Sequence, residues 1–262
     1  MDQVLWTLTF AALLVLLVVL LGRDRARRFP LFMASVAVIA LRLLVTRLLF
    51  NRIKPLVLSE ILLTLADLSV VAALLVIWEM ARTAFAKAPR WVGIGVTVAG
   101  LAVSGSVLAF WGPWPSWATF TASSTLATLR RMQMGAEKGN LLAAMLAIEL
   151  AVLLLIFGRR FGAGWRSHVQ RIVLGLAVAA AAQLTVRGVW QAITLKAVVH
   201  SRTQYDQLMT LRDRMYSAND IVYFGVLIWW IVCLWIDEPG AKIDDAEPSA
   251  SSVAEPAARA AT

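Results

Sequence analysis

Residues 3–28 read QVLWTLTFAALLVLLVVLLGRDRARR, and this stretch decides the fold. Residues 3–21 carry no charged side chain, and a helix needs about 20 such apolar residues to cross the hydrocarbon core of a bilayer. Arginines follow the apolar run at positions 23, 25, 27 and 28 instead of preceding it. A cleaved signal peptide has the opposite order, with its basic residues first. The stretch therefore predicts a transmembrane helix that stays in the protein.

The whole chain shares this apolar character. It is 60% hydrophobic and only 16% charged, with a mean hydropathy of +0.74, whereas about 25% of the residues of a soluble domain are charged. This composition excludes a soluble enzyme and predicts an integral membrane protein, with the lipid bilayer as its main partner. The formal charge of +9 is expected in loops that face anionic lipid, so it does not indicate a nucleic acid partner.

Apolar runs of spanning length recur along the chain, and no proline interrupts them. We predict an all-α, polytopic membrane helix bundle with seven transmembrane helices in a single domain, residues 1–237. The predicted spans are residues 3–21, 31–50, 56–78, 91–111, 141–158, 171–196 and 221–237. Residues 238–262 are rich in Ala, Ser, Pro, Asp and Glu, so we expect a disordered cytoplasmic tail.

Basic residues predict the orientation. Only Asp2 precedes the first span, and arginines follow it, so the positive-inside rule places the N-terminus outside and the C-terminus in the cytoplasm of a bacterial inner membrane. The basic loops around residues 82–90 and 159–171 then also fall on the inner side. We expect these loops to contact anionic lipid or a cytoplasmic protein partner.

Small residues mark two of the spans. Glycines recur in span 91–111, and residues 179–182 are all alanine. Because small residues let helix backbones approach closely, we predict that both spans are central in the bundle. Between spans, residues 112–140 begin with tryptophans typical of a membrane interface, and we expect the remainder of this segment to extend the fifth span as a surface helix. The periodicity of residues 197–220 predicts a short amphipathic helix.

Ionisable side chains inside the spans are the candidate functional residues, because each costs about 2.5 to 3.5 kcal/mol at the centre of a membrane helix. At about 1.5 Å per residue, Arg42 and Asp67 lie about 15 Å and about 18 Å below the outer ends of their helices. Arg47 and Glu60 both lie about 7.5 Å deep. Antiparallel neighbouring helices would thus hold two ion pairs in register.

Glu149 and Arg187 repeat this arrangement in the fifth and sixth spans, at depths of about 12 Å and about 13 Å. Polar residues continue at helical spacing along the sixth span, from Gln183 to Thr194. We predict an outward-facing polar cavity with these ligand-binding residues: Arg42, Asp67, Glu149, Gln183, Arg187 and Gln191. Three interpretations stay open for them, namely structural ion pairs that hold the bundle together, a ligand pocket, and a translocation path.

The side chains that catalysts and cofactors need are scarce. His168 and His200 are the only histidines and fall in predicted loops on opposite sides, which excludes a haem held by two histidines and a two-histidine metal site. The last span lacks the lysine of a retinal Schiff base. No nucleophile elbow or phosphate-binding loop occurs. We predict no enzyme activity and no cofactor.

Several short motifs resemble uncharacterised bacterial seven-helix integral membrane proteins, a family without an assigned activity. They are Arg28–Ala34 at the start of the second span, Glu60–Glu79 along the third, Phe161–Ser167 in the third inner loop and Asn219–Asp220 before the last span. The resemblance covers most of the chain, and its most specific part is Phe-Gly-x-x-Trp-Arg at residues 161–166. It implies the seven-helix architecture and assigns no site.

The function predicted from these features is non-catalytic, a sensory or accessory membrane module whose outward-facing cavity recognises a small ligand or a partner. The alternative is a transporter or channel for a small solute or ion that uses the same intramembrane charges. A transporter needs polar continuity toward both faces. The inner halves of the third, fifth and sixth spans are nearly all Leu, Val, Ala and Ile, which favours the sensory module.

Overall fold

The computed structural model describes residues 3–50, 52–86, 88–110, 114, 121, 123–158, 167–196 and 201–237. These described residues form helices and no strand: α1 (Gln3–Gly22), α2 (Arg25–Arg28), α3 (Pro30–Leu49), α4 (Pro55–Ala84), α5 (Arg90–Phe110), α7 (Thr125–Phe157), α8 (His168–Lys196) and α9 (Arg202–Trp235). The all-α prediction is confirmed. The predicted tail, residues 238–262, lies outside the described residues.

Six helices, namely α1, α3, α4, α7, α8 and α9, are long and apolar enough to cross a membrane. Large apolar side chains such as Val18, Leu75 and Ile156 are exposed on them, and soluble proteins rarely expose large contiguous apolar surfaces. These features are compatible with a multi-pass membrane protein. The span predicted at residues 91–111 is not among the six, because α5 has only a shorter apolar stretch, Thr97–Phe110.

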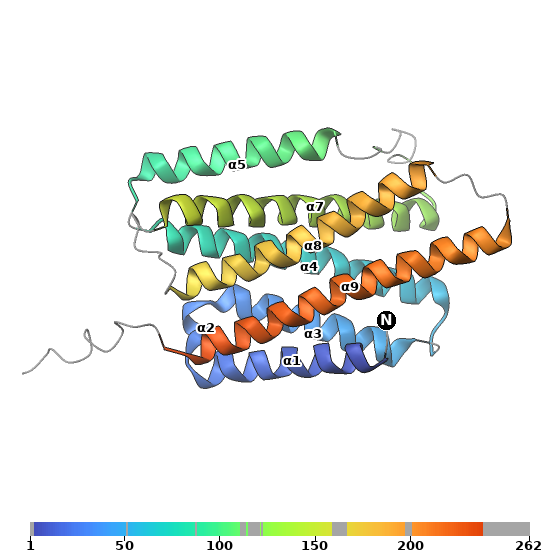
Figure 1. Ribbon diagram of the computed structural model, residues 1–262, viewed down its shortest axis with the longest axis horizontal. Helices are drawn as coiled ribbons and strands as arrows, with labels where there is room; N and C mark the ends of the chain where they lie inside the picture. Colours follow the sequence, from blue (N-terminus) through green and yellow to red (C-terminus); the bar gives the residue numbers. More distant parts are fainter. Residues whose placement is uncertain are drawn as a thin grey trace, which may run out of the picture.

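The six long helices pack in a closed ring, in the order α1, α3, α4, α7, α8, α9 and back to α1 (Figure 1). α8 also contacts α4 across the ring, whereas α5 packs on α7 from outside it. The sixth span, α8, therefore contacts α4, α7 and α9, whereas the prediction that residues 91–111 are central in the bundle is wrong. Of the α5 glycines, Gly100 approaches Glu149 on α7, while Gly93, Gly95 and Gly105 have open space around them.

Two helices begin well before their predicted membrane spans, as the sequence led us to expect for the segment before the fifth span but not for the segment before the last. The hydroxyl of Ser124 accepts a hydrogen bond from the N–H of Ala127 (3.2 Å) and caps α7, and Ser201 does the same for Gln204 (3.2 Å) at the start of α9. With 33 and 34 residues these helices are about 50 Å long, which exceeds the about 30 Å of a hydrocarbon core. Residues 125–140 and 202–220 thus continue the spans that follow them.

The ring has two ends, which we name after residues that lie there. At the Gln3 end α1, α4, α7 and α9 begin and α3 and α8 finish; at the Asp237 end the directions are reversed (Figure 1). Proline starts two of the helices, Pro30 in α3 and Pro55 in α4, where its missing N–H has no helical partner to lose.

The Asp237 end contains most of the fully buried apolar side chains. One of them, Phe32, packs edge-to-face on Trp230 with 5.1 Å between the ring centroids. Five residues from five helices fill the centre of this end, and we call them the apolar plug: Phe32, Met80, Leu154, Ile172 and Trp230. Interiors packed in this way leave no room for water.

A buried carboxylate is part of the same end. Glu79 of α4 accepts hydrogen bonds from the backbone N–H groups of Leu31 (3.1 Å) and Phe32 (2.9 Å) at the start of α3. The first N–H groups of a helix lack internal partners, and the positive end of the helix dipole favours a negative charge. Glu79 therefore fastens α4 to α3, and its charge is compensated within the protein.

Candidate functional site

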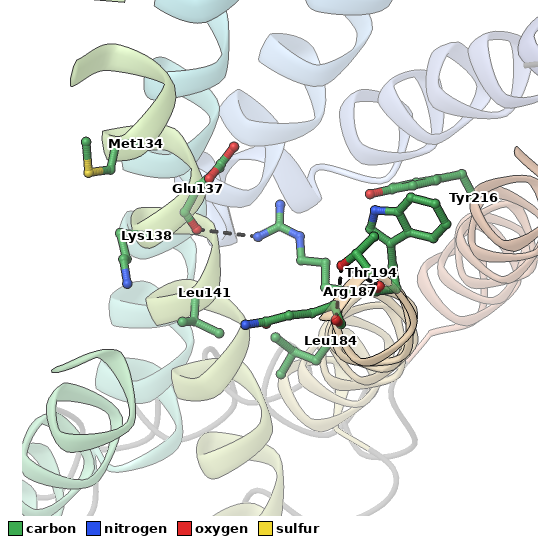
Figure 2. Close-up of a pocket in the computed structure, with 10 residues that line it drawn as sticks. Met134, Glu137, Lys138, Leu141, Leu184, Arg187, Thr194 and Tyr216 are labelled. Atoms are coloured by element: carbon green, nitrogen blue, oxygen red, sulfur yellow. Dashed lines mark hydrogen bonds between the residues drawn. The ribbon is translucent and has the colours of Figure 1, made fainter. Parts of the chain in front are cut away.

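A pocket of about 440 Å³ lies near the Gln3 end, between α7 and α8 with one residue of α9 (Figure 2). We call it the shallow pocket. It is lined by Met134, Glu137, Lys138, Leu141, Leu184, Arg187, Trp190, Gln191, Thr194 and Tyr216. The polar stripe predicted on the sixth span thus faces this pocket through Arg187 and Gln191.

Arg187 retains an uncompensated positive charge in the shallow pocket. Figure 2 shows its guanidinium reaching from α8 toward α7, where it donates a hydrogen bond to the backbone carbonyl of Glu137 (3.4 Å). The Glu137 carboxylate instead accepts a hydrogen bond from Gln133 Nε2 (2.9 Å) on its own helix. Within the described part of the chain, no ion pair involves Arg187.

A second pocket, of about 370 Å³, lies farther from the Gln3 end along the same helices. We call it the deep pocket. Residues of α3, α4, α7, α8 and α9 line it: Arg42, Ala73, Ile77, Asn140, Ala143, Ala144, Ala147, Leu176, Ala179, Ala180, Gln183, Asn219, Asp220 and Tyr223. Its volume lies in the range of about 300–1,000 Å³ that is typical of small-molecule sites.

Alanines create the space in the deep pocket. Ala143, Ala144 and Ala147 of α7 face Ala179 and Ala180 of α8 across it. Side chains this short let the two helices pack together and still leave a gap where longer ones would fill it. The alanine run that predicted close helix packing therefore also makes the cavity.

Polar groups in the deep pocket lack the partners that buried polar groups usually have. The Arg42 guanidinium forms neither a hydrogen bond nor an ion pair with the described residues, and Asp220 forms no ion pair with a described side chain. The Tyr223 hydroxyl is buried and has no hydrogen-bond partner among the described residues. The Arg42 guanidinium and the Tyr223 hydroxyl thus line the deep pocket without a partner among the described residues. The Asp220 carboxylate adds a negative charge to the same lining, where the side chain of Asn219 hydrogen-bonds it, and Asp220 also borders a neighbouring pocket beside Arg212 and Asp213.

The apolar plug closes the deep pocket on the side of the Asp237 end. On α4, α7, α8 and α9 the plug residue lies within about two turns of the nearest pocket residue, as Met80 does from Ile77 and Trp230 from Tyr223. On α3 the separation is larger, from Arg42 to Phe32. The Trp230 indole N–H donates to the carbonyl of Ile172 (3.3 Å), which joins α9 to α8 at this level. The plug therefore lies nearer the Asp237 end than either pocket.

The predicted ion pairs do not form. No ion pair between described residues joins Arg42 to Asp67, Arg47 to Glu60, or Glu149 to Arg187. Equal depth on neighbouring helices was the basis of the prediction, but depth does not determine which way a side chain faces around its helix. Arg47 instead lies over the ring of Trp6, 5.7 Å from its centroid.

Of the predicted site residues, Arg42 and Gln183 line the deep pocket, whereas Arg187 and Gln191 line the shallow pocket. Asp67 and Glu149 line neither. Asp67 faces α7, where a Cβ added at Gly135 would lie 3.6 Å from its Oδ1. Glu149 faces α5 and accepts a hydrogen bond from the Ser104 hydroxyl (2.9 Å).

Sequence analysis missed Asp220 and Tyr223 as site residues. It began the last span at residue 221, treated residues 197–220 as a loop with a short amphipathic helix, and did not single out Tyr223 within the span. A signal was present in the chain: Asp213, Tyr216, Asp220 and Tyr223 follow one another at spacings of three, four and three. This spacing is that of one helix face and would have extended the last span backward into the pocket.

The chemistry of both pockets is that of charge and hydrogen bonding. Among the residues that the structure describes, no three His, Cys, Asp or Glu side chains gather as ligands for a metal ion. No protein-family model, curated protein or solved structure matches this chain. The resemblance to bacterial seven-helix membrane proteins therefore stays a prediction.

Proposed function

We propose that this chain is a non-catalytic, seven-span protein of a bacterial cytoplasmic membrane, in which an outward-facing polar cavity recognises a small ligand. Its role is that of a sensory or accessory module. The observation that carries the proposal is the deep pocket, with the free guanidinium of Arg42 on one side and the apolar plug beneath it.

The direction of the helices supports a seventh crossing by α5. α4 and α7 run in the same direction, so the chain between them has to return along the bundle, and α5 runs that way (Figure 1). Seven crossings leave Gln3 and Asp237 on opposite sides of the membrane. α5 would cross at the periphery, in contact with lipid and α7.

The distribution of arginines supports the orientation. Arg23, Arg25, Arg27 and Arg28 lie at the Asp237 end, as does Arg82 at the end of α4. The positive-inside rule then assigns the Asp237 end to the cytoplasm, so that the two pockets lie on the outer side of the apolar plug. A basic inner surface of this kind attracts anionic lipid or an acidic segment of a partner protein.

The plug favours recognition over transport. A transporter or channel needs a polar route to both faces, and the plug residues offer no polar side-chain group toward the deep pocket apart from the Trp230 indole N–H, which is already bonded to α8. A ligand that enters from outside would meet this barrier and leave by the same route.

α9 provides a physical link from the pocket to the cytoplasmic side. It contributes Asp220 and Tyr223 to the deep pocket, and just after its end Asp237 pairs with Arg25 (2.8 Å) and Arg23 (3.5 Å). A ligand that prefers one position of α9 would shift the population of states at this ion-pair cluster.

The test is the thermal stability of the detergent-purified protein across a panel of small polar molecules and ions. A ligand at a hundred times its dissociation constant stabilises the native state by about 2.7 kcal/mol. We expect a stabilising compound whose effect is lost in Arg42→Gln and kept in Arg130→Gln, an exposed arginine of α7 outside both pockets. Stabilisation that is equal in both variants would contradict a role for the deep pocket.

The same compound then separates recognition from transport. In proteoliposomes that contain the wild-type protein, the proposal predicts binding of the radiolabelled compound without its accumulation in the lumen. Saturable uptake that is lost in Arg42→Gln would replace the sensory proposal by the transporter.

A further inference from the structure

The deep pocket presents opposite charges from opposite sides. Arg42 lies on α3 and Asp220 on α9, two helices that α1 separates in the ring. No contact of 4.0 Å or less pairs them. Opposite charges in a region of low dielectric attract strongly, so the helices hold these two groups apart across the cavity.

From this arrangement we propose that the deep pocket binds a small zwitterion, with its anionic group on Arg42 and its cationic group on Asp220. The proposal rests on the proposed function and specifies its ligand. A zwitterion compensates both side chains at once, whereas a singly charged ligand leaves one charge uncompensated inside the membrane, where that is costly.

Neutral polar groups between the charges fit the same class of ligand. The unpartnered Tyr223 hydroxyl and the amides of Asn140 and Gln183 offer donors and acceptors to a short polar molecule, while the side chain of Asn219 hydrogen-bonds the Asp220 carboxylate. The alanines that line the pocket make no specific contact with a ligand. The separation of Arg42 and Asp220 would therefore determine the length of the ligand.

The shallow pocket is compatible with this assignment, because it lies on the path to the deep one and carries Arg187 without a carboxylate partner among the described residues. The charged residues of this pocket, Glu137, Lys138 and Arg187, do not themselves define a pair of charges that selects a zwitterion. Binding of anions alone would therefore indicate the shallow pocket instead of the deep one.

The experiment uses amino acids in which methylene groups separate the two charges, namely glycine, β-alanine, 4-aminobutanoate and 6-aminohexanoate. Butanoate and butylammonium serve as singly charged controls of similar size. Binding to the full-length protein in detergent is measured by calorimetry. We expect at least one of these amino acids to bind about tenfold or more tightly than both controls. Each control lacks one charged group of the ligand and therefore leaves one charged side chain of the desolvated pocket without its partner.

Variants assign the two ends of the ligand. Arg42→Gln should abolish the preference for the zwitterion over butylammonium, and Asp220→Asn should abolish the preference over butanoate. Arg130→Gln and Asp206→Asn remove exposed charges outside the pockets and should leave both preferences unchanged. A preference that survives in Arg42→Gln or in Asp220→Asn would overturn the proposal.

Failure of this inference can be told apart from failure of the proposed function. If no zwitterion binds better than the controls, while a neutral or anionic compound stabilises the wild type in an Arg42-dependent way, the ligand class is wrong and the cavity function stands. If no compound of either experiment binds, both proposals fall.

Discussion

The two ends of the helix ring are made by the same six helices and treat a buried charge in opposite ways. At the Asp237 end, Glu79 is buried and its carboxylate is fully engaged by the first N–H groups of α3. At the other end of the same α3, Arg42 faces a cavity and has no partner among the described residues. The comparison teaches that an intramembrane charge is evidence for a site only where the protein itself does not compensate it.

The largest expected effect on stability comes from removing the buried Glu79 carboxylate at the Asp237 end. Glu79→Ala leaves two buried N–H groups without an acceptor, so we expect it to destabilise the protein by about 3 kcal/mol. Thermal unfolding in detergent would measure this, with Glu79→Gln as the control that keeps one acceptor oxygen and loses less. A Glu79→Ala protein as stable as the wild type would show that this capping contact does not matter.

The next effect probes the packing of the plug. A Cβ at Gly175 would overlap the indole of Trp230, whereas one at Gly225 would meet open space. Gly175→Ala should therefore cost about 1–3 kcal/mol through overpacking. Gly225→Ala should stabilise α9 by about 0.5–1 kcal/mol. Opposite signs in unfolding experiments are the expected result, and equal signs would mean that Trp230 can move aside.

A smaller effect concerns the ion pairs that tie the end of α9 to the α1–α3 connection. Asp237 is half exposed, so Asp237→Asn should destabilise by at most about 1 kcal/mol, and less at high salt. Asp24→Asn, which removes the more exposed pair with Arg27, serves as the control and should change nothing measurable. Unfolding in low and high sodium chloride would compare the two, and a loss that persists in high salt would indicate a buried role for Asp237.

The smallest effect is expected at the polar end. Without ligand, Arg42→Gln should stay within about 0.5 kcal/mol of the wild type, because no protein contact is lost. If Arg42 belonged to a buried ion pair, the loss would be about 3–5 kcal/mol. A large loss in chemical unfolding would thus restore the interpretation of these charges as structural.

The sequence predicted the fold of this protein more completely than its site. Spanning helices follow from the length of the apolar runs, so α1, α3 and α8 lie close to their predicted bounds, and α4 begins where predicted but continues past residue 78 to Ala84. The starts of α7 and α9 do not follow from apolar length, because their first turns are polar where they extend beyond a hydrocarbon core. The sequence indicated a helical extension before the fifth span without its bounds, and it did not show that α9 is one continuous helix. The packing of α5 outside the ring was missed, since glycines permit close contact without requiring it.

The sequence predicted only part of the site. Depth along a helix can be counted from the sequence, and it placed Arg42, Gln183 and Arg187 in one half of the bundle. The direction around a helix depends on which neighbours it packs against, and no residue count provides that. Glu149 therefore faces Ser104 of α5 instead of Arg187, and Asp220 entered the site only once α9 was known to be continuous.

The most direct test of the difference between the two ends is the reactivity of two cysteines on α7. Ala144 lines the deep pocket, and Ala151, two turns farther on the same face, is equally buried near the plug. In a Cys233→Ser background, which removes the single native cysteine, each alanine is replaced by cysteine and treated with a charged thiol reagent on either side of oriented vesicles. The account predicts that Ala144→Cys reacts from the outside only and Ala151→Cys from neither side. Reaction of Ala151→Cys from the cytoplasmic side, or none of Ala144→Cys, would contradict it.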